Sequence, residues 1–318
     1  MVRFNKLNLA LWVFAFPAAY IWSLFLLQYY VAGDQVHYRA FYEVINSASL
    51  KEALLLARGY VDAGEPVTIF ILWLGSSFSF PKDQYISFFN AILVMQVILL
   101  LRKYKAGFVV ILLFLSNYYL IVLMTGAERL KFAYIFLLMS VLLNSNMSRL
   151  FFFAAPLAHF QSLVFAPSLL LSKFYEEVRA FLKKGFFSRR FLFFLFSVTV
   201  IFVFFLAIFF PSLASKALAY ASADRSPLVI LNLLVLTVVA LLASRNWKRM
   251  LVVLLPFYPL VLILGGERVN MVAITLSLWV LMTENRLRHP LVLLMLLYFS
   301  FKSFSFVRNI LLFGNGFA

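Results

Sequence analysis

The feature that most constrains this chain is a series of apolar runs, each close to the length that crosses a lipid bilayer. Phe191–Phe210 and Leu228–Ala243 are continuous runs, without the alternation of polar and apolar residues seen in barrel strands. A helix satisfies its own backbone hydrogen bonds, so about 20 such residues span the hydrocarbon of a membrane. The sequence therefore predicts an all-α, polytopic transmembrane protein.

Composition and charge placement support this class and exclude others. Only 13% of the 318 residues are charged, compared with roughly 25% in soluble proteins. The net charge of +16 comes from basic clusters beside apolar runs, such as Arg102 to Lys105 and Lys183 with Lys184. This placement is typical of cytoplasmic loops and does not indicate a nucleic-acid partner. The absence of cysteine excludes disulfides and thiolate chemistry.

The N-terminal run sets the predicted orientation. Arg3 and Lys6 precede an apolar stretch at about Leu9–Val31 that lacks a small-residue cleavage site, so we expect a retained first span. Basic residues before it place the N-terminus in the cytoplasm. Asp34 then emerges on the opposite side, the periplasm or cell exterior.

A polar interval at about 32–66 follows and is predicted to be an external loop with local helices. A helix over Gln35–Asn46 would place tyrosines on one side, and the stretch from Ser49 to Glu52 has the form of a capping box. The next run, Val67–Phe80, is too short to cross comfortably, which favours a re-entrant or surface-lying helix.

The rest of the chain predicts a single integral membrane domain over 1–318, with roughly ten hydrophobic segments in total. A second external loop is expected at 211–227, and a basic amphipathic segment at Lys173–Arg190 is expected on the cytoplasmic leaflet. The remaining apolar runs are Tyr85–Leu101, Phe108–Thr125, Phe132–Leu143, Leu150–Ser172, Leu251–Leu264, Met271–Thr283 and Leu291–Phe306.

Under this topology several charged residues reach the same outer face. Two outward runs end in the same order of Gly, Glu and Arg, and a guanidinium fork suits phosphate bidentately. His159, between two prolines, is expected away from the cytoplasmic face, where a broken helix would line a cavity. The charged residues of this face are Asp34, Glu65, Glu128, Arg129, Glu267 and Arg268.

Each of these residues also has a purely structural interpretation. Asp34 is a possible helix cap, and His159 a hydrogen-bonded packing histidine. Arg129 can pair with its neighbour Glu128, as Arg268 can with Glu267, or extend its charge to the interface. Glu65, which precedes Pro66, can be a plain interfacial stop. The histidines lack metal-ligand spacing, so no metal site is expected.

The order of these residues resembles the EpsG-like branch of bacterial polysaccharide polymerases, the Wzy-type O-antigen polymerases. The resemblance covers most of the chain. It departs at Gln35, where the family usually has tyrosine after the aspartate, and at Gln161, inside a His-x-Ser element. The residues that carry it are Asp34 with Tyr38 and Phe41, Glu65-Pro66, Arg129 with Ala133, His159 to Ser162, and Arg268.

This resemblance implies a membrane glycosyltransferase of GT-C-like fold at the outer face of the bacterial inner membrane. It would join oligosaccharide repeat units, with undecaprenyl-pyrophosphate-linked glycans as donor and acceptor, and would need no metal or other cofactor. A chain-length regulator protein is a candidate partner, besides the bilayer. Asp34, Glu65 and His159 are the implied catalytic candidates. Pyrophosphate and substrate binding is assigned to Arg129, Arg268, Glu128, Glu267 and Tyr38.

Asp34 is our first choice for the base that activates the acceptor hydroxyl, because it directly follows a span. Two other functional classes remain open from the sequence. A lipid-linked glycan flippase or transporter would place charges at mid-span and show internal repeats. An O-antigen ligase uses the same donor as a polymerase, and a membrane acyltransferase is a further alternative.

Overall fold

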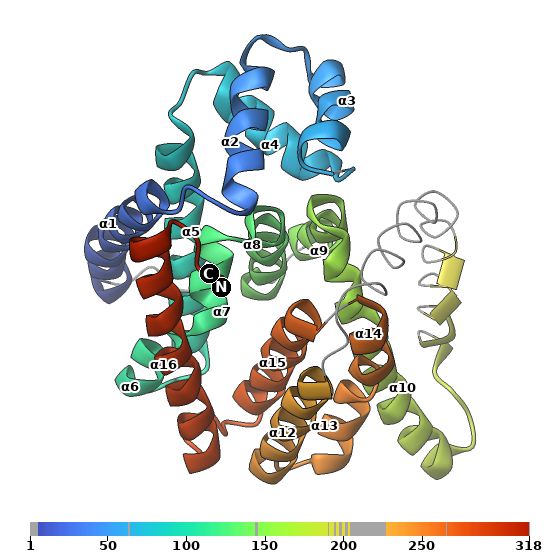
Figure 1. The fold of residues 1–318 in the computed structure, drawn as a ribbon. Coiled ribbons are helices and arrows are strands. Elements are labelled where there is room, and N and C mark those ends of the chain that lie inside the picture. Colours follow the sequence, from blue (N-terminus) through green and yellow to red (C-terminus); the bar gives the residue numbers. More distant parts are fainter. Residues whose placement is uncertain are drawn as a thin grey trace. The chain divides into compact units, whose positions relative to one another are not determined.

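The computed structural model describes residues 6–62, 64–143, 146–189, 227–264 and 266–317, with short pieces between 191 and 203. Every secondary-structure element in these ranges is a helix, as expected (Figure 1). The chain divides into two compact units. Unit 1 comprises Met1–Ser162 and Leu293–Ala318, and unit 2 comprises Leu163–Val292.

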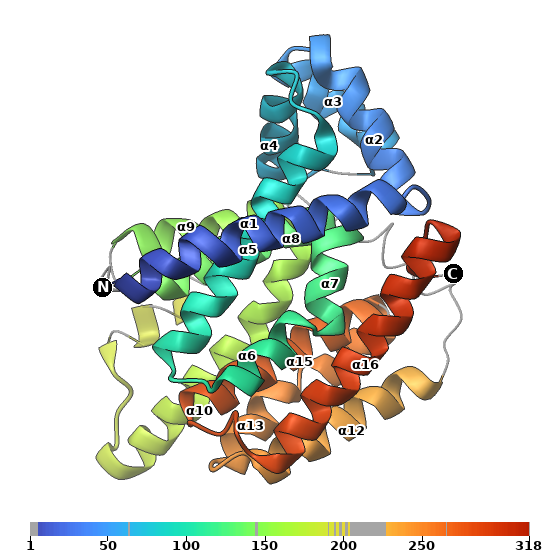
Figure 2. The ribbon, with the colours of Figure 1, turned by 90° about the vertical axis from the view of Figure 1, so that its left-hand side faces the viewer.

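The first helix of unit 1, α1 (Lys6–Tyr29), matches the predicted first span and packs along α5 (Lys82–Lys103) (Figure 2). Small polar side chains hold the two helices together. The Ser23 hydroxyl lies 3.0 Å from that of Ser87, and the Asn90 amide donates to Ser23 at 2.6 Å. These buried hydrogen bonds fix the register of α1 on α5.

Three helices and one short turn follow α1 and lie together at one end of unit 1 (Figure 1). They are α2 (Asp34–Val44), η1 (Ile45–Ser47), α3 (Leu50–Tyr60) and α4 (Pro66–Ser77). The predicted polar interval is therefore largely helical. The helix predicted over Gln35–Asn46 is confirmed, because α2 and η1 together cover these residues.

The predicted capping box at the start of α3 is confirmed. The backbone and hydroxyl of Ser49 donate to the Glu52 carboxylate at 2.7 and 2.8 Å, and the Glu52 backbone donates to the Ser49 hydroxyl. These hydrogen bonds hold the pKa of Glu52 below its ordinary value, because they favour the charged carboxylate. The sequence signal was sufficient here because all of the partners are local.

The short apolar run after Pro66 forms α4, a helix of 12 residues. Close packing explains the glycine within it, since a Cβ on Gly75 would overlap the Tyr85 ring. The chain then turns at Ser79, where φ is 55°, and enters α5 after Pro81. This turn brings Lys82 next to the helices that precede it.

The remainder of unit 1 consists of α6 (Phe108–Leu115), α7 (Tyr118–Thr125), α8 (Glu128–Leu142), α9 (Asn146–Ala158), the first part of η2 (Phe160–Val164) and most of α16 (Pro290–Phe313). The predicted single run Phe108–Thr125 is instead bent by 44° between α6 and α7. Asn117 causes a helix restart there, because its side chain accepts from the Tyr119 backbone at 2.9 Å.

Unit 2 contains α10 (Phe165–Lys184), α12 (Pro227–Ala243), α13 (Trp247–Leu254), α14 (Phe257–Leu264) and α15 (Gly266–Thr283). Polar contacts join its parts. Ser244 donates to the Glu284 carboxylate at 2.9 Å, and the Arg286 guanidinium donates to the Ala243 carbonyl. The predicted external loop at 211–227 lies, except for its last residue, outside the described residues.

Two of the described helices, α5 and α16, are long and apolar enough to cross a membrane. The number rises to four if each of two bent helix pairs counts as one span, the α1–α2 and α6–α7 pairs. Parts of α4, α9, α12 and α15 are shorter apolar helices. The described chain is therefore compatible with a helical membrane protein, and the expectation of roughly ten segments stays a prediction.

Candidate functional site

Glu65 is the centre of a buried polar cluster in unit 1. It occupies the N-cap of α4, and Pro66 follows at the first helical position, where a missing N–H costs nothing. The side chain is only 1% exposed. Its Oε2 accepts a hydrogen bond from the Gly64 backbone at 3.1 Å. A carboxylate buried this deeply requires charged or hydrogen-bonding partners.

Those partners come from two distant segments. An Arg129 nitrogen, at the start of α8, lies 3.1 Å from Oε2 of Glu65, and His159 Nδ1, just after α9, lies 2.8 Å from Oε1. The Thr68 hydroxyl donates to the Ala158 carbonyl at 2.7 Å, which fixes the end of α9 against α4. The carboxylate is thus held between a guanidinium and an imidazole.

Arg129 is held from two further sides. The same nitrogen donates to the Asp62 carbonyl at 3.1 Å. The guanidinium also interacts electrostatically with Tyr38, which is buried on α2. We call Tyr38, Glu65, Arg129 and His159 the Glu65 cluster. Four of the residues singled out in the sequence therefore lie together.

The Glu65 cluster has the arrangement of an acid–base site. A carboxylate bound to Nδ1 fixes the imidazole orientation and keeps a proton on that nitrogen, which makes Nε2 the basic nitrogen. The imidazolium formed by proton uptake is stabilised by the adjacent carboxylate. His159 keeps 14% of its side chain exposed, whereas Glu65 keeps 1%. The site can therefore accept a proton at His159.

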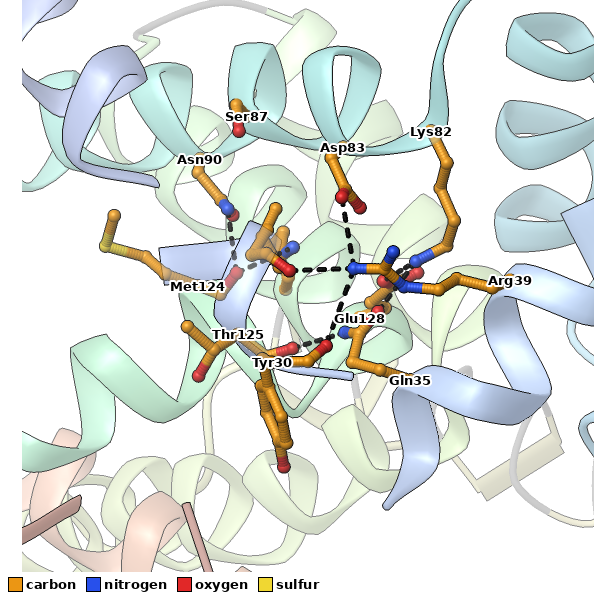
Figure 3. Close-up of polar contacts among 12 residues, drawn as sticks. Tyr30, Gln35, Arg39, Lys82, Asp83, Ser87, Asn90, Met124, Thr125 and Glu128 are labelled. Carbon is orange, nitrogen blue, oxygen red and sulfur yellow. Dashed lines mark hydrogen bonds and ion pairs between the residues drawn. The ribbon is translucent and has the colours of Figure 1, made fainter. Parts of the chain in front are cut away.

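A second buried cluster adjoins the first. It includes the predicted site residue Glu128, but its pairing was not predicted; Figure 3 labels Gln35, Lys82 and Glu128. Lys82 donates to Glu128 Oε1 at 2.6 Å and to Gln35 Oε1 at 2.7 Å, and the Gln35 amide donates to the Thr125 carbonyl. The Lys82 ammonium also lies 5.9 Å from the centre of the Tyr38 ring. Gln35, where the resembled family has tyrosine, thus links α2 to α5 and α7. We call Gln35, Lys82 and Glu128, with Lys131, the Glu128 cluster.

An ion pair between α2 and α5 lies next to this cluster. Arg39 contacts Asp83 at 3.0 Å and donates to the Leu27 carbonyl at 2.7 Å (Figure 3). The sequence signal for Lys82 and Asp83 was present but local, since both follow a proline that ends an apolar run. Such a position indicates a helix start and does not indicate which distant side chains it meets.

The structure corrects two of the structural interpretations. Asp34 does not cap α2, because Gly33 occupies the N-cap with φ 61° and Asp34 is the first helical residue, with an exposed side chain. Arg129 does not pair with its neighbour Glu128 but with Glu65, and Glu128 pairs with Lys82.

Two predicted site residues lie elsewhere in the chain. Glu267 and Arg268 belong to the first turn of α15 in unit 2, and their side chains are outside the described part of the structure. Their proposed part in substrate binding remains a prediction. No group of three or more His, Asp or Glu side chains suited to a metal ion occurs among the described residues.

Comparison with known protein families, with characterised proteins and with solved structures finds no match to this chain. The described structure by itself defines a helical protein that has apolar helices of membrane-crossing length and a buried Glu–Arg–His cluster.

Proposed function

We propose that this protein is a bacterial inner-membrane glycosyltransferase that polymerises lipid-linked oligosaccharide repeat units at the periplasmic face. The observation that carries the proposal is the Glu65 cluster, in which residues from three separate segments meet at one buried carboxylate. The same residues carry the resemblance to the EpsG-like, Wzy-type polymerases. A GT-C-like arrangement of about ten segments belongs to this proposal.

In the proposed reaction a sugar hydroxyl of the acceptor attacks the anomeric carbon of the donor. The bond between that carbon and the polyprenyl pyrophosphate breaks, and the hydroxyl proton passes to His159 Nε2. Glu65 holds His159 in orientation at 2.8 Å. The leaving pyrophosphate needs positive charge, which arginines supply without a metal; Arg129 is the described candidate and Arg268 the second.

The direct test is incubation of the purified protein, in sealed lipid vesicles that also contain lipid A core, with an undecaprenyl-pyrophosphate-linked repeat unit. We expect a ladder of products that differ by one repeat unit. A single product on lipid A core would instead identify a ligase. Movement of the repeat unit across the bilayer without new glycosidic bonds would identify a flippase.

Two residues compete for the part of proton acceptor. The sequence favours Asp34, but Asp34 is exposed at the start of α2, whereas His159 is bound to a buried carboxylate. We therefore expect His159→Asn to slow polymerisation by about 10² to 10⁴ and Asp34→Asn to stay within about tenfold of the wild type. Rates from the ladder assay decide, and the opposite order would move the base to Asp34.

The orientation of the chain gives a further prediction. Because the protein lacks cysteine, single introduced cysteines are labelled without background. In inside-out and right-side-out vesicles, an impermeant thiol reagent should reach a cysteine beside Asp34 only from the periplasmic side. Cysteines at Arg102, Lys183 and Arg245 should react only from the cytoplasmic side. Cytoplasmic labelling beside Asp34 would contradict the proposed site.

A transporter is the second candidate, and the Glu128 cluster favours it. Charged residues buried in membrane proteins often line substrate or ion paths, and Glu128 and Lys131 are both fully buried. Both Lys82 and Glu128, however, begin helices, a position that suits a structural pair as well as a path. The vesicle assay separates the two functions, because only transport moves the repeat unit without extending it.

A further inference from the structure

Lys131 is a buried amine with few partners. It lies on α8 with none of its side chain exposed. Its one hydrogen bond among the described residues goes to the Met124 carbonyl, at the long distance of 3.3 Å. A charged ammonium has three N–H groups to satisfy, and burial without acceptors is costly. This environment favours the uncharged amine over the ammonium.

Glu128 is the complementary half of this arrangement. Lys82 binds its Oε1, but its Oε2 is buried and has no hydrogen-bond partner in the described structure. Glu128 and Lys131 are three residues apart on α8, so they share one face of the helix. Lys131 therefore lies about one helical turn after a buried carboxylate whose second oxygen has no hydrogen-bond donor among the described residues.

The charges around Lys131 oppose one another. Glu128 on its own helix and Asp83 on α5 favour the ammonium, and Lys82 on α5 opposes it. Gln35, which contributes to the cluster from α2, carries no charge. Two carboxylates thus favour the ammonium form of Lys131 and one ammonium opposes it, while the Lys82–Glu128 ion pair is a separate contact of 2.6 Å.

We propose that the Lys131 amine and the unpartnered oxygen of Glu128 form an internal proton-binding site, which takes up one proton from the solution and returns it. Uptake converts the amine to an ammonium that the negative charge of Glu128 stabilises, and release restores the neutral amine. The site goes beyond the proposed glycosyl transfer, because it needs no glycan substrate.

A proton bound at Lys131 affects the Glu65 cluster through the first turn of α8. Glu128 and Arg129 are consecutive residues in the first turn of α8, and Arg129 binds Glu65 at 3.1 Å. Protonation of Lys131 adds one positive charge to that turn. The arrangement therefore links the protonation of the core to the helix end that holds the candidate catalytic carboxylate.

The test is a titration of lysine side-chain nitrogens by NMR on the full chain in nanodiscs, with ¹⁵N-labelled lysine. Lys131→Met identifies the resonance of Lys131 by its loss. We expect this resonance to change from ammonium to amine well below the ordinary lysine value of about 10.4. An ammonium that persists at Lys131 up to the ordinary value would overturn the proposal.

Removing each neighbouring charge should shift the pH of the Lys131 transition, in opposite directions for the two variants. A lysine that serves only in packing would show no such shifts. Lys82→Met removes a competing charge, so the Lys131 transition should move to higher pH. Asp83→Asn removes an attractive charge and should move it to lower pH. Equal transitions in all three proteins would contradict the site. In the wild type, the free energy of unfolding should rise with pH between the pH at which Lys131 loses its proton in the folded protein and about 10.4, because the unfolded chain binds a proton there that the folded chain does not. Lys131→Met should remove this rise.

Discussion

Replacing Glu65 by Gln is expected to remove the product ladder, with a loss of about 10² to 10⁴ in rate. Gln has nearly the same shape but no charge, so it neither stabilises an imidazolium at His159 nor neutralises Arg129. Both partners lie within 3.1 Å of the carboxylate, so the change affects the whole Glu65 cluster. Polymerisation of a lipid-linked repeat unit is the measurement.

The control must separate chemistry from folding, because loss of one partner of a buried ion pair is itself destabilising. Glu43→Gln changes an exposed glutamate on the neighbouring α2 and should leave activity unchanged. The double variant Glu65→Gln with Arg129→Met removes both charges and should regain stability without regaining activity. A Glu65→Gln protein that folds normally and makes wild-type ladders would show that Glu65 is a helix boundary only.

Lys82→Met is expected to cause the largest loss of stability. The Lys82–Glu128 contact is 2.6 Å, with the two side chains 9% and 0% exposed. Without Lys82, the buried Glu128 carboxylate loses the donor to its Oε1, and its Oε2 already has no hydrogen-bond partner in the described structure. Breaking a buried pair from one side costs about 3 to 5 kcal/mol, which lowers the thermal midpoint by on the order of 10 °C. Thermal unfolding in detergent measures the change.

Three comparisons make this prediction specific. Lys51→Met removes an exposed lysine and should leave the midpoint unchanged. Lys82→Met combined with Glu128→Met removes both charges and should recover most of the loss, since apolar replacement of a whole buried pair is often neutral. The loss in Lys82→Met should be larger at alkaline pH, where a neutral Lys131 cannot compensate Glu128. A midpoint within about 1 °C of the wild type would contradict a structural role for the pair.

The sequence by itself determined that the described chain is helical and determined part of its local structure. Continuous apolar runs have few alternatives to helices, because backbone groups away from water must be satisfied within the segment. The Ser49 to Glu52 capping box and the helix start at Glu65-Pro66 were readable because all of their partners lie within a few residues. Local chemistry of this kind needs no knowledge of the fold.

Only the tertiary structure decided which charges pair. Glu128 and Arg129 look like partners in the sequence, but consecutive residues of a helix point about 100° apart and do not face each other. Glu128 therefore meets Lys82, 46 residues earlier, and Arg129 meets Glu65, 64 residues earlier. Such pairings depend on how helices distant in the chain pack, and no local pattern encodes them.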